Sequence, residues 1–239
     1  MPLMEHLIEL RRRLLISVAA VLICGVVVFM LYNRVLHFLS GPYEHATKNT
    51  QGCGVHGCKL IVTDPLAPFL VRLKIALYGG LALSVPIVMW QIWRFIVPGL
   101  HKRERRYAVG FLLSAILLFV LGCAVAWFTA TKALEFLLGI GGHSIRPLID
   151  ANKYLTLMML LFAAFGFAFE FPVLLVFLLL VGAVNTRQLR NSRRWAAVGV
   201  ATFAAVITPS QDPFSMLMMA IPMYIFYEGS ILVGRILRK

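Results

Sequence analysis

The chain has 239 residues, of which 60% are hydrophobic and 14% are charged, and its formal net charge is +13. Soluble domains carry about 25% charged residues, so the composition excludes a soluble protein and indicates an integral membrane protein. The positive charge does not indicate nucleic-acid binding, because the Lys and Arg residues lie in short segments between apolar stretches, without a helix-turn-helix or similar module.

Six apolar stretches are candidates for membrane-spanning helices, each of which needs about 20 apolar residues. The expected spans cover residues 14–33, 69–97, 107–130, 153–182, 195–208 and 214–234. The first has no small-residue cleavage site before Asn33, so we expect a retained helix rather than a signal peptide. The last two are short, and the fifth must thin the bilayer or pack against its neighbours. We therefore expect one all-α membrane domain over residues 1–239.

The distribution of Lys and Arg predicts the orientation of these spans. Fourteen of the 23 basic residues lie in the N-terminal segment, in the loops at 98–106 and 183–194, and in the tail after residue 234, whereas the longer alternate loops hold six. Loops rich in Lys and Arg stay in the cytoplasm. We therefore expect both termini to be cytoplasmic, with Glu9 and Glu104 facing the same compartment.

Prolines within the spans predict kinked helices and hence a curved, cup-shaped wall. Pro86 interrupts the second span and Pro172 the fourth, and proline removes a backbone hydrogen bond and bends a helix. Glu170 lies two residues before Pro172, and a charge at mid-span costs about 2.5–3.5 kcal/mol. Its carboxyl is expected to face protein or water. It either pins two helices by a hydrogen bond or serves a partner helix or a proton-linked site.

Cys53 and Cys58 bracket the stretch "CGVHGC" in the first outward loop. Two Cys residues in a Gly-rich loop can reach bonding distance in a compartment that permits disulfides. His56 makes a metal site conceivable, but no fourth ligand is evident and the spacing is not a usual zinc pattern. We favour a disulfide that closes the loop, and we expect no metal.

Two carboxylates lie within basic clusters. Glu9 stands in "HLIELRRRL", beside three arginines, and Glu104 stands in "PGLHKRERRYA". One interpretation is local ion pairing, from Glu9 to Arg12 or Arg13 and from Glu104 to its neighbours, at about 0.2–1 kcal/mol a pair. The other is a ligand with two adjacent guanidinium groups, each of which prefers a bidentate carboxylate.

No motif of an enzyme is present. The sequence lacks His-Glu-x-x-His, Gly-x-Ser-x-Gly and a phosphate-binding Gly-x4-Gly-Lys-Ser/Thr, so we expect no catalytic residue, no cofactor and no ATP hydrolysis. A secondary transporter or channel for a small cation or peptide, with Glu170 as its coupling site, is the alternative. The absence of an internal repeat argues mildly against it.

Four stretches in order, "HLIELRRRL", "PGLHKRERR", "AFGFAFEFP" and "AIPMYIFYE", resemble the TatC family, the multispanning subunit of the twin-arginine protein translocase. The resemblance covers nearly the whole chain. It implies a cytoplasmic-membrane receptor for the twin-arginine signal peptides of folded proteins, which nucleates export driven by the proton gradient. Its implied partners are TatA- and TatB-type single-span proteins, the lipid bilayer and other copies of itself.

The same resemblance assigns roles to residues. For signal-peptide binding it implies Glu9, Glu104, Arg11, Lys102, Arg105 and Phe95. For contact with a partner helix it implies Glu170 and Pro172, and for the structure of the outward face Pro42, Pro68, Phe69 and Asp212. The loop that holds Asp212 reads "TPSQDP", one residue longer than the family's usual Thr-Pro-Pro-Asp, and the Cys53–Cys58 pair is not a general family feature.

Overall fold

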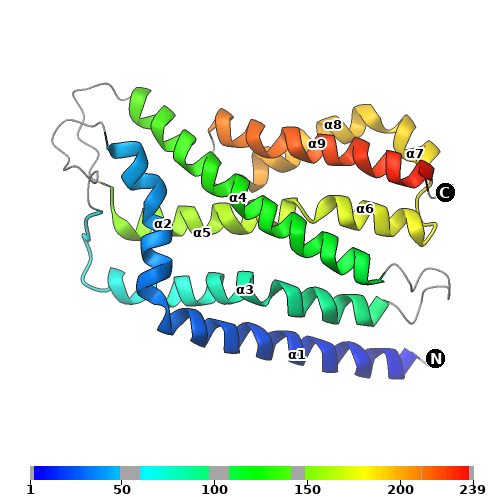
Figure 1. The fold of residues 1–239 in the computed structure, drawn as a ribbon, viewed down its shortest axis with the longest axis horizontal. Coiled ribbons are helices and arrows are strands. Elements are labelled where there is room, and N and C mark those ends of the chain that lie inside the picture. Colours follow the sequence, from blue (N-terminus) through cyan, green and yellow to red (C-terminus); the bar gives the residue numbers. More distant parts are fainter. Residues whose placement is uncertain (1–2, 49–59, 97–107, 141–148, 211, 237–239) are drawn as a thin grey trace.

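Long helices run roughly along one direction and a single helix lies across them in the computed structural model (Figure 1), which describes residues 3–48, 60–96, 108–140, 149–210 and 212–236. The helices of this part are α1 (Leu3–Met30), α2 (Tyr32–Thr47), α3 (Ala67–Ile96), α4 (Ala108–Ile140), α5 (Ala151–Ala168), α6 (Phe171–Leu180), α7 (Thr186–Asn191), α8 (Arg193–Ile207) and α9 (Pro213–Ile236). The β-structure within these ranges is an isolated bridge between Ile61 and Asp150.

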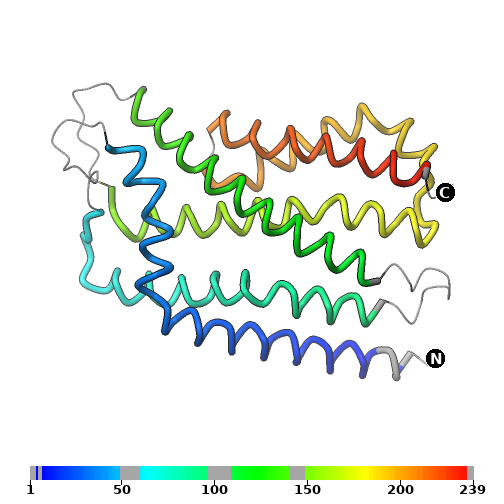
Figure 2. Tube along the Cα trace, viewed as in Figure 1, coloured from blue at the N-terminus to red at the C-terminus, as the bar shows by residue number. Residues whose placement is uncertain are grey.

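The chain trace places the beginning of α1 and the end of α9 at the same end of the molecule (Figure 2). The end of α3 and the beginning of α4 lie there too, and we call this end the terminal face. Helices α1 and α3 lie side by side, α4 crosses the front obliquely, and α8 and α9 pack beside α5 and α6. The crosswise helix α2 lies toward the opposite face.

Within the described residues, five helical segments are long and apolar enough to cross a membrane, and they include α5 and α6 as one segment over Ala151–Leu180. The sixth candidate, α8, has only 15 residues. It packs against α9, which has 24. The first helix starts well before the predicted residue 14, because the Leu, Glu and Arg residues of "HLIELRRRL" are good helix formers and continue the helix beyond its apolar part.

The close approach of α1 and α3 depends on glycines. A Cβ atom at Gly80 would lie 2.6 Å from the Cα and 2.7 Å from the backbone nitrogen of Gly25, and a Cβ at Gly79 would lie 2.7 Å from a methyl of Val28. Small residues let the backbones of membrane helices meet, and dispersion contacts then hold the pair. This contact sets the register between the two helices.

Helix α2 is not predicted from the sequence, since the expected spans leave residues 34–68 outside any helix. In the structure Pro42 lies inside the helix, and the Tyr154 hydroxyl repairs the neighbouring backbone bond. That hydroxyl donates to the Leu39 carbonyl (2.9 Å) and accepts from the Tyr43 N–H (3.2 Å). Tyr43 and Tyr154 are both buried and their rings pack at 5.5 Å. A contact from a distant span thus maintains a helix that its own sequence disfavours.

The fourth predicted span is broken where Pro172 predicts a bend. Helix α5 ends at Ala168, α6 begins at Phe171, and the Glu170 N–H bonds the Phe167 carbonyl (3.1 Å) in a tighter turn. Pro172 has no N–H with which to continue the helical bonding. The break directs Glu170 out of the regular helix and into the face described below.

Candidate functional site

Glu9 lies on the second turn of α1 at the terminal face, in an ion pair with Arg13. The Arg13 Nη2 contacts Glu9 Oε1, and the Arg13 Nε donates to the same oxygen at 3.1 Å. This i,i+4 spacing is one of those predicted, since residues four apart are neighbours on a helix. The third guanidinium nitrogen, Arg13 Nη1, donates to Gln91 Oε1 on α3 at 3.4 Å. The pair therefore joins two spans.

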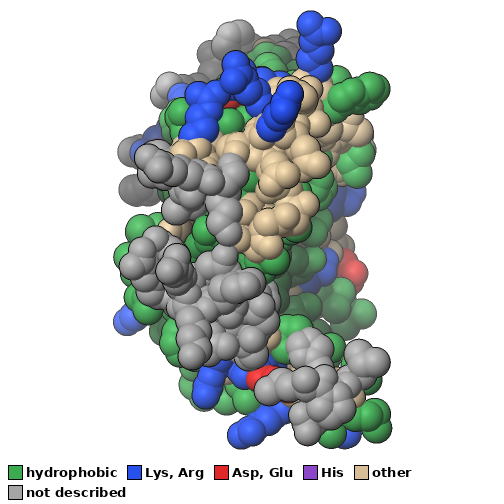
Figure 3. All heavy atoms as spheres, turned by 90° about the vertical axis from the view of Figure 1, so that its right-hand side faces the viewer, with side chains coloured by type: hydrophobic (Ala, Val, Ile, Leu, Met, Phe, Trp, Pro, Cys, Tyr) green, Lys and Arg blue, Asp and Glu red, His purple; other side chains and the backbone are tan. Residues whose placement is uncertain are grey.

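A hollow of about 140 Å³ surrounds this pair. Its lining residues are Glu9, Arg12, Arg13, Ile16, Gln91 and Arg94. The described lining thus offers one carboxylate against three guanidinium groups and carries a net positive charge. The view onto the terminal face shows basic side chains gathered around its margins, with few acidic atoms among them (Figure 3).

The other residues predicted for signal-peptide binding are placed unequally. Arg11 is exposed on α1, and Phe95 is half-buried in the last turn of α3. Glu104, Lys102 and Arg105 lie outside the described residues. The helices that flank them, α3 and α4, end and begin at the terminal face (Figure 1). Their segment therefore joins the fold at the same face as Glu9.

A second concavity of about 420 Å³ lies at the α5–α6 break, and we call it the Glu170 groove. Its lining residues are Met89, Ile92, Trp93, Phe111, Leu112, Ala115, Phe167, Glu170, Phe171, Val173, Leu174, Phe177 and Phe203. Glu170 is the one acidic residue of this described lining. The Glu170 Oε1 is buried and has no hydrogen-bond partner among the described residues, and the same holds for the Trp93 Nε1. Pro172 is buried in the first turn of α6, directly behind this wall.

The role of Trp93 in this groove was not predicted from the sequence. Its indole stacks on Phe111 with ring centroids 5.0 Å apart and meets Phe177 edge-on at 6.1 Å. The indole is therefore fixed beside Glu170. Gln91 and Arg94 were missed as well, because nothing in the sequence aligns α3 with α1.

Of the residues predicted for the outward face, Pro42, Pro68 and Phe69 lie on elements toward the end opposite the terminal face, whereas Asp212 precedes α9, which begins short of that end (Figure 1). Pro42 is buried in α2, whereas Pro68 and Phe69 are exposed in the first turn of α3. Asp212 is 4% exposed and accepts a bond from the Ser215 N–H at 2.7 Å, which caps α9. Cys53 and Cys58 lie outside the described residues, so their disulfide stays a prediction.

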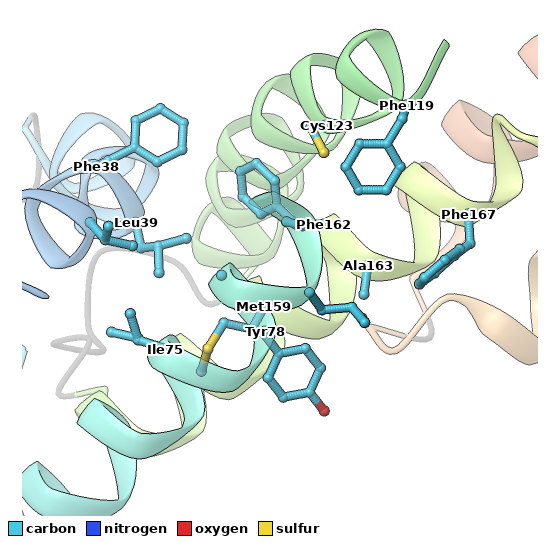
Figure 4. Close-up of a pocket in the computed structure, with 14 residues that line it drawn as sticks. Phe38, Leu39, Ile75, Tyr78, Phe119, Cys123, Met159, Phe162, Ala163 and Phe167 are labelled. Atoms are coloured by element: carbon cyan, nitrogen blue, oxygen red, sulfur yellow. The ribbon is translucent and has the colours of Figure 1, made fainter. Parts of the chain in front are cut away.

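A smaller cavity of about 160 Å³ lies among α2, α3, α4 and α5. Figure 4 shows it surrounded by rings and aliphatic chains, with Phe38, Phe119 and Phe162 around it. The heteroatoms on its labelled side chains are the Cys123 and Met159 sulfurs and the Tyr78 hydroxyl. The lining suits apolar packing and offers no acid–base pair. The described residues also hold no group of three or more His, Cys, Asp or Glu side chains that could bind a metal.

Comparison with known proteins is consistent across family, sequence and structure. Residues 5–222 match the family model of the "Sec-independent protein translocase protein (TatC)". Relatives with that name include proteins of Frankia casuarinae (40% identical, 98% of this chain, 65% of the relative), Escherichia coli K12 (36%, 98% and 88%) and Aquifex aeolicus (36%, 99% and 95%). The chain thus spans just under two thirds of the Frankia relative and most of the other two.

Among solved structures, the fold superposes on one titled "Crystal Structure of Twin Arginine Translocase Receptor- TatC", with a TM-score of 0.81 and 34% identity, over 98% of this chain and 100% of that chain. A second structure, titled "Crystal Structure of Twin Arginine Translocase Receptor- TatC in DDM", matches with a TM-score of 0.81 and 35% identity, over 96% of this chain and 99% of that chain. The predicted fold class, a kinked and cup-shaped bundle of six spans, is confirmed.

Proposed function

This chain belongs to the TatC family of Sec-independent protein translocase proteins, and we propose that it is the receptor subunit that binds the twin-arginine signal peptides of folded cargo. As a multi-pass protein of this family it resides in a membrane. We propose that this is the cytoplasmic membrane, with the terminal face in the cytoplasm. Binding nucleates a translocation complex driven by the proton gradient, without ATP hydrolysis by this chain.

The observation that carries the proposal is the position of Glu9 in a cationic hollow at the terminal face. The described lining holds one carboxylate and three arginines, and that carboxylate is already paired with Arg13. A second carboxylate is needed, and Glu104 belongs to the segment that joins α3 and α4 at that face. Two carboxylates suit two guanidinium groups, because each guanidinium forms a planar bidentate pair that lysine cannot copy.

The remaining predicted residues fit this arrangement. Phe95 provides an apolar contact for the hydrophobic part of the peptide, at the end of α3 nearest to Gln91 and Arg94. Arg11, Lys102 and Arg105 hold the surrounding segments at the surface of the membrane, where anionic lipid attracts them.

Peptide binding tests this function directly. The purified protein in lipid nanodiscs is expected to bind a labelled twin-arginine signal peptide, and replacement of both arginines by lysine is expected to weaken binding by at least about tenfold, or 1.4 kcal/mol. Titration by fluorescence anisotropy measures both peptides under the same conditions. Equal affinity for the two peptides would refute the proposal.

We propose that the Glu170 groove receives the membrane helix of a TatA- or TatB-type partner. Its walls are apolar, and both the carboxyl and the indole N–H in it lack partners among the described residues. Glu170→Leu is expected to reduce photo-crosslinking of such a helix to a probe at Leu174 by at least about threefold, because a polar group of that helix that pairs with the Glu170 carboxyl would then be buried without a partner. Glu135→Leu is the matched control, since Glu135 forms an exposed pair with Lys132 on α4. Equal loss in both variants would contradict the assignment.

The comparisons favour the translocase function over a small-solute transporter. The transporter hypothesis requires uptake by this chain alone in liposomes and its loss in Glu170→Gln. We expect no such uptake.

A further inference from the structure

We propose that Arg13 is a built-in competitor for the signal peptide: its guanidinium occupies Glu9, and an arginine of the peptide must displace it. This inference deepens the proposed function, on which it rests. It concerns regulation of the binding site rather than the identity of its ligand.

The geometry of the pair is that of a ligand in its site. Two nitrogens of Arg13, Nε and Nη2, point to one oxygen of Glu9. The contact is a guanidinium–carboxylate pair, the type of interaction expected of an incoming arginine, made here by a residue of the same helix and directed to one oxygen only. Because the side chains of Glu9 and Arg13 are only 27% and 16% exposed, a peptide cannot pair fully with Glu9 Oε1 while Arg13 stays in place.

Gln91 gives Arg13 a second attachment. Its Oε1 accepts from Arg13 Nη1 at 3.4 Å, across from α3. A neutral amide holds a guanidinium less strongly than a carboxylate does, so Gln91 orients Arg13 without removing it from Glu9. A displaced Arg13 keeps this contact, which provides a resting position a short distance from its first one.

The exchange explains a requirement for two arginines in physical terms. A ligand with one guanidinium replaces one arginine–carboxylate pair by another, and the electrostatic gain is small. A ligand with two guanidinium groups regenerates the lost pair at Glu9 and keeps a second guanidinium, whose further pairing is a net gain. The displacement of Arg13 therefore costs free energy that a ligand with one cationic side chain does not recover.

Three single variants separate displacement from simple charge repulsion. Arg13→Gln removes both the competitor and a positive charge, whereas Arg12→Gln removes the same charge from the same hollow without touching the Glu9–Arg13 pair. Arg13→Lys keeps the charge but cannot donate to Glu9 and Gln91 from one planar group. Thermal stability and size-exclusion profiles of each variant in nanodiscs verify that it is folded.

Titration with the twin-arginine peptide is expected to show affinity raised about threefold to tenfold in Arg13→Gln, the range for loss of a half-buried ion pair. We expect a smaller rise in Arg13→Lys and a change of less than about twofold in Arg12→Gln. Unchanged or weakened binding in Arg13→Gln would overturn the inference and make Arg13 a residue that positions Glu9 for the peptide. Equal rises in Arg13→Gln and Arg12→Gln would overturn it in favour of charge repulsion.

A second measurement needs no peptide. Carbodiimide with glycinamide modifies accessible carboxylates, and mass spectrometry of the digested protein reports the rate at Glu9. This rate is expected to be several-fold higher in Arg13→Gln than in Arg12→Gln, and equal rates would show that Arg13 does not cover Glu9. If the wild type failed to distinguish the twin-arginine from the lysine peptide, the proposed function would fail, and the labelling rates would still decide whether Arg13 shields Glu9.

Discussion

Alanine at Glu9 or at Glu104 is expected to weaken binding of a twin-arginine peptide by about 2 kcal/mol or more, a loss of about thirtyfold. Removing one partner of a charge-assisted pair leaves the guanidinium of the ligand unpaired. In this hollow it also leaves the ligand against three arginines. The loss at Glu9 is partly offset, because Arg13 no longer needs to be displaced from it.

The double variant Glu9→Ala/Glu104→Ala is expected to lose less than the sum of the two single losses, because both carboxylates serve one ligand. Crosslinking of a labelled peptide and titration by anisotropy measure binding to the wild type, the two single variants and the double variant. Glu135→Ala controls for loss of a carboxylate elsewhere, since its exposed pair with Lys132 is at a distance from the terminal face. Undiminished crosslinking in the double variant would rule out the two-carboxylate site.

Gly80→Ala is expected to lower the stability of the fold more than the other glycine-to-alanine substitution considered below. The added Cβ would lie 2.6 Å and 2.7 Å from backbone atoms of Gly25, and a backbone cannot rotate away as a side chain can. Overpacking of this kind costs about 1–3 kcal/mol. Because the same contact sets the register of α1 and α3, the shift also separates Arg13 from Gln91.

The melting temperature of each variant is measured by size-exclusion chromatography after heating. A fall of several degrees in Gly80→Ala would verify the prediction. Gly199→Ala is the matched control, since a Cβ there meets nothing within 4 Å. Alanine favours a helix over glycine by about 1 kcal/mol, so the control is expected to be neutral or slightly stabilised. Similar melting temperatures for the two variants would show that α1 and α3 can move apart without loss of stability.

Much of the fold could be predicted, because apolar length and proline position are local properties of the sequence. The spans and the break beside Pro172 follow from them. Helix α2 does not, because its backbone is completed by Tyr154, more than a hundred residues away. The extent of α1 before residue 14 was also missed, since hydropathy marks the apolar core of a helix and not its polar end.

Some features of the candidate site could likewise be predicted from the sequence, and others could not. The pairing of Glu9 with Arg13 follows from helical spacing and is confirmed. Gln91 and Trp93 could not be assigned, because their roles depend on how α3 aligns with α1 and α4. Pairs of glycines on two spans are a signal of such close contact, although they do not reveal its register. The role of Glu104 stays a prediction from resemblance.

The hydroxyl of Tyr154 also has a consequence for the order of synthesis. It bridges the Tyr43 N–H and the Leu39 carbonyl, and it is translated 111 residues after Tyr43. The chain emerges from the ribosome N-terminus first at about 5–20 residues per second, so for several seconds after the synthesis of α2 the bridge from Tyr154 cannot form. During that interval α2 lacks its contact with α5. The packing of α2 against Tyr154 can therefore form only after the fourth span has been synthesised. A nascent chain that ends before Tyr154 lacks this contact.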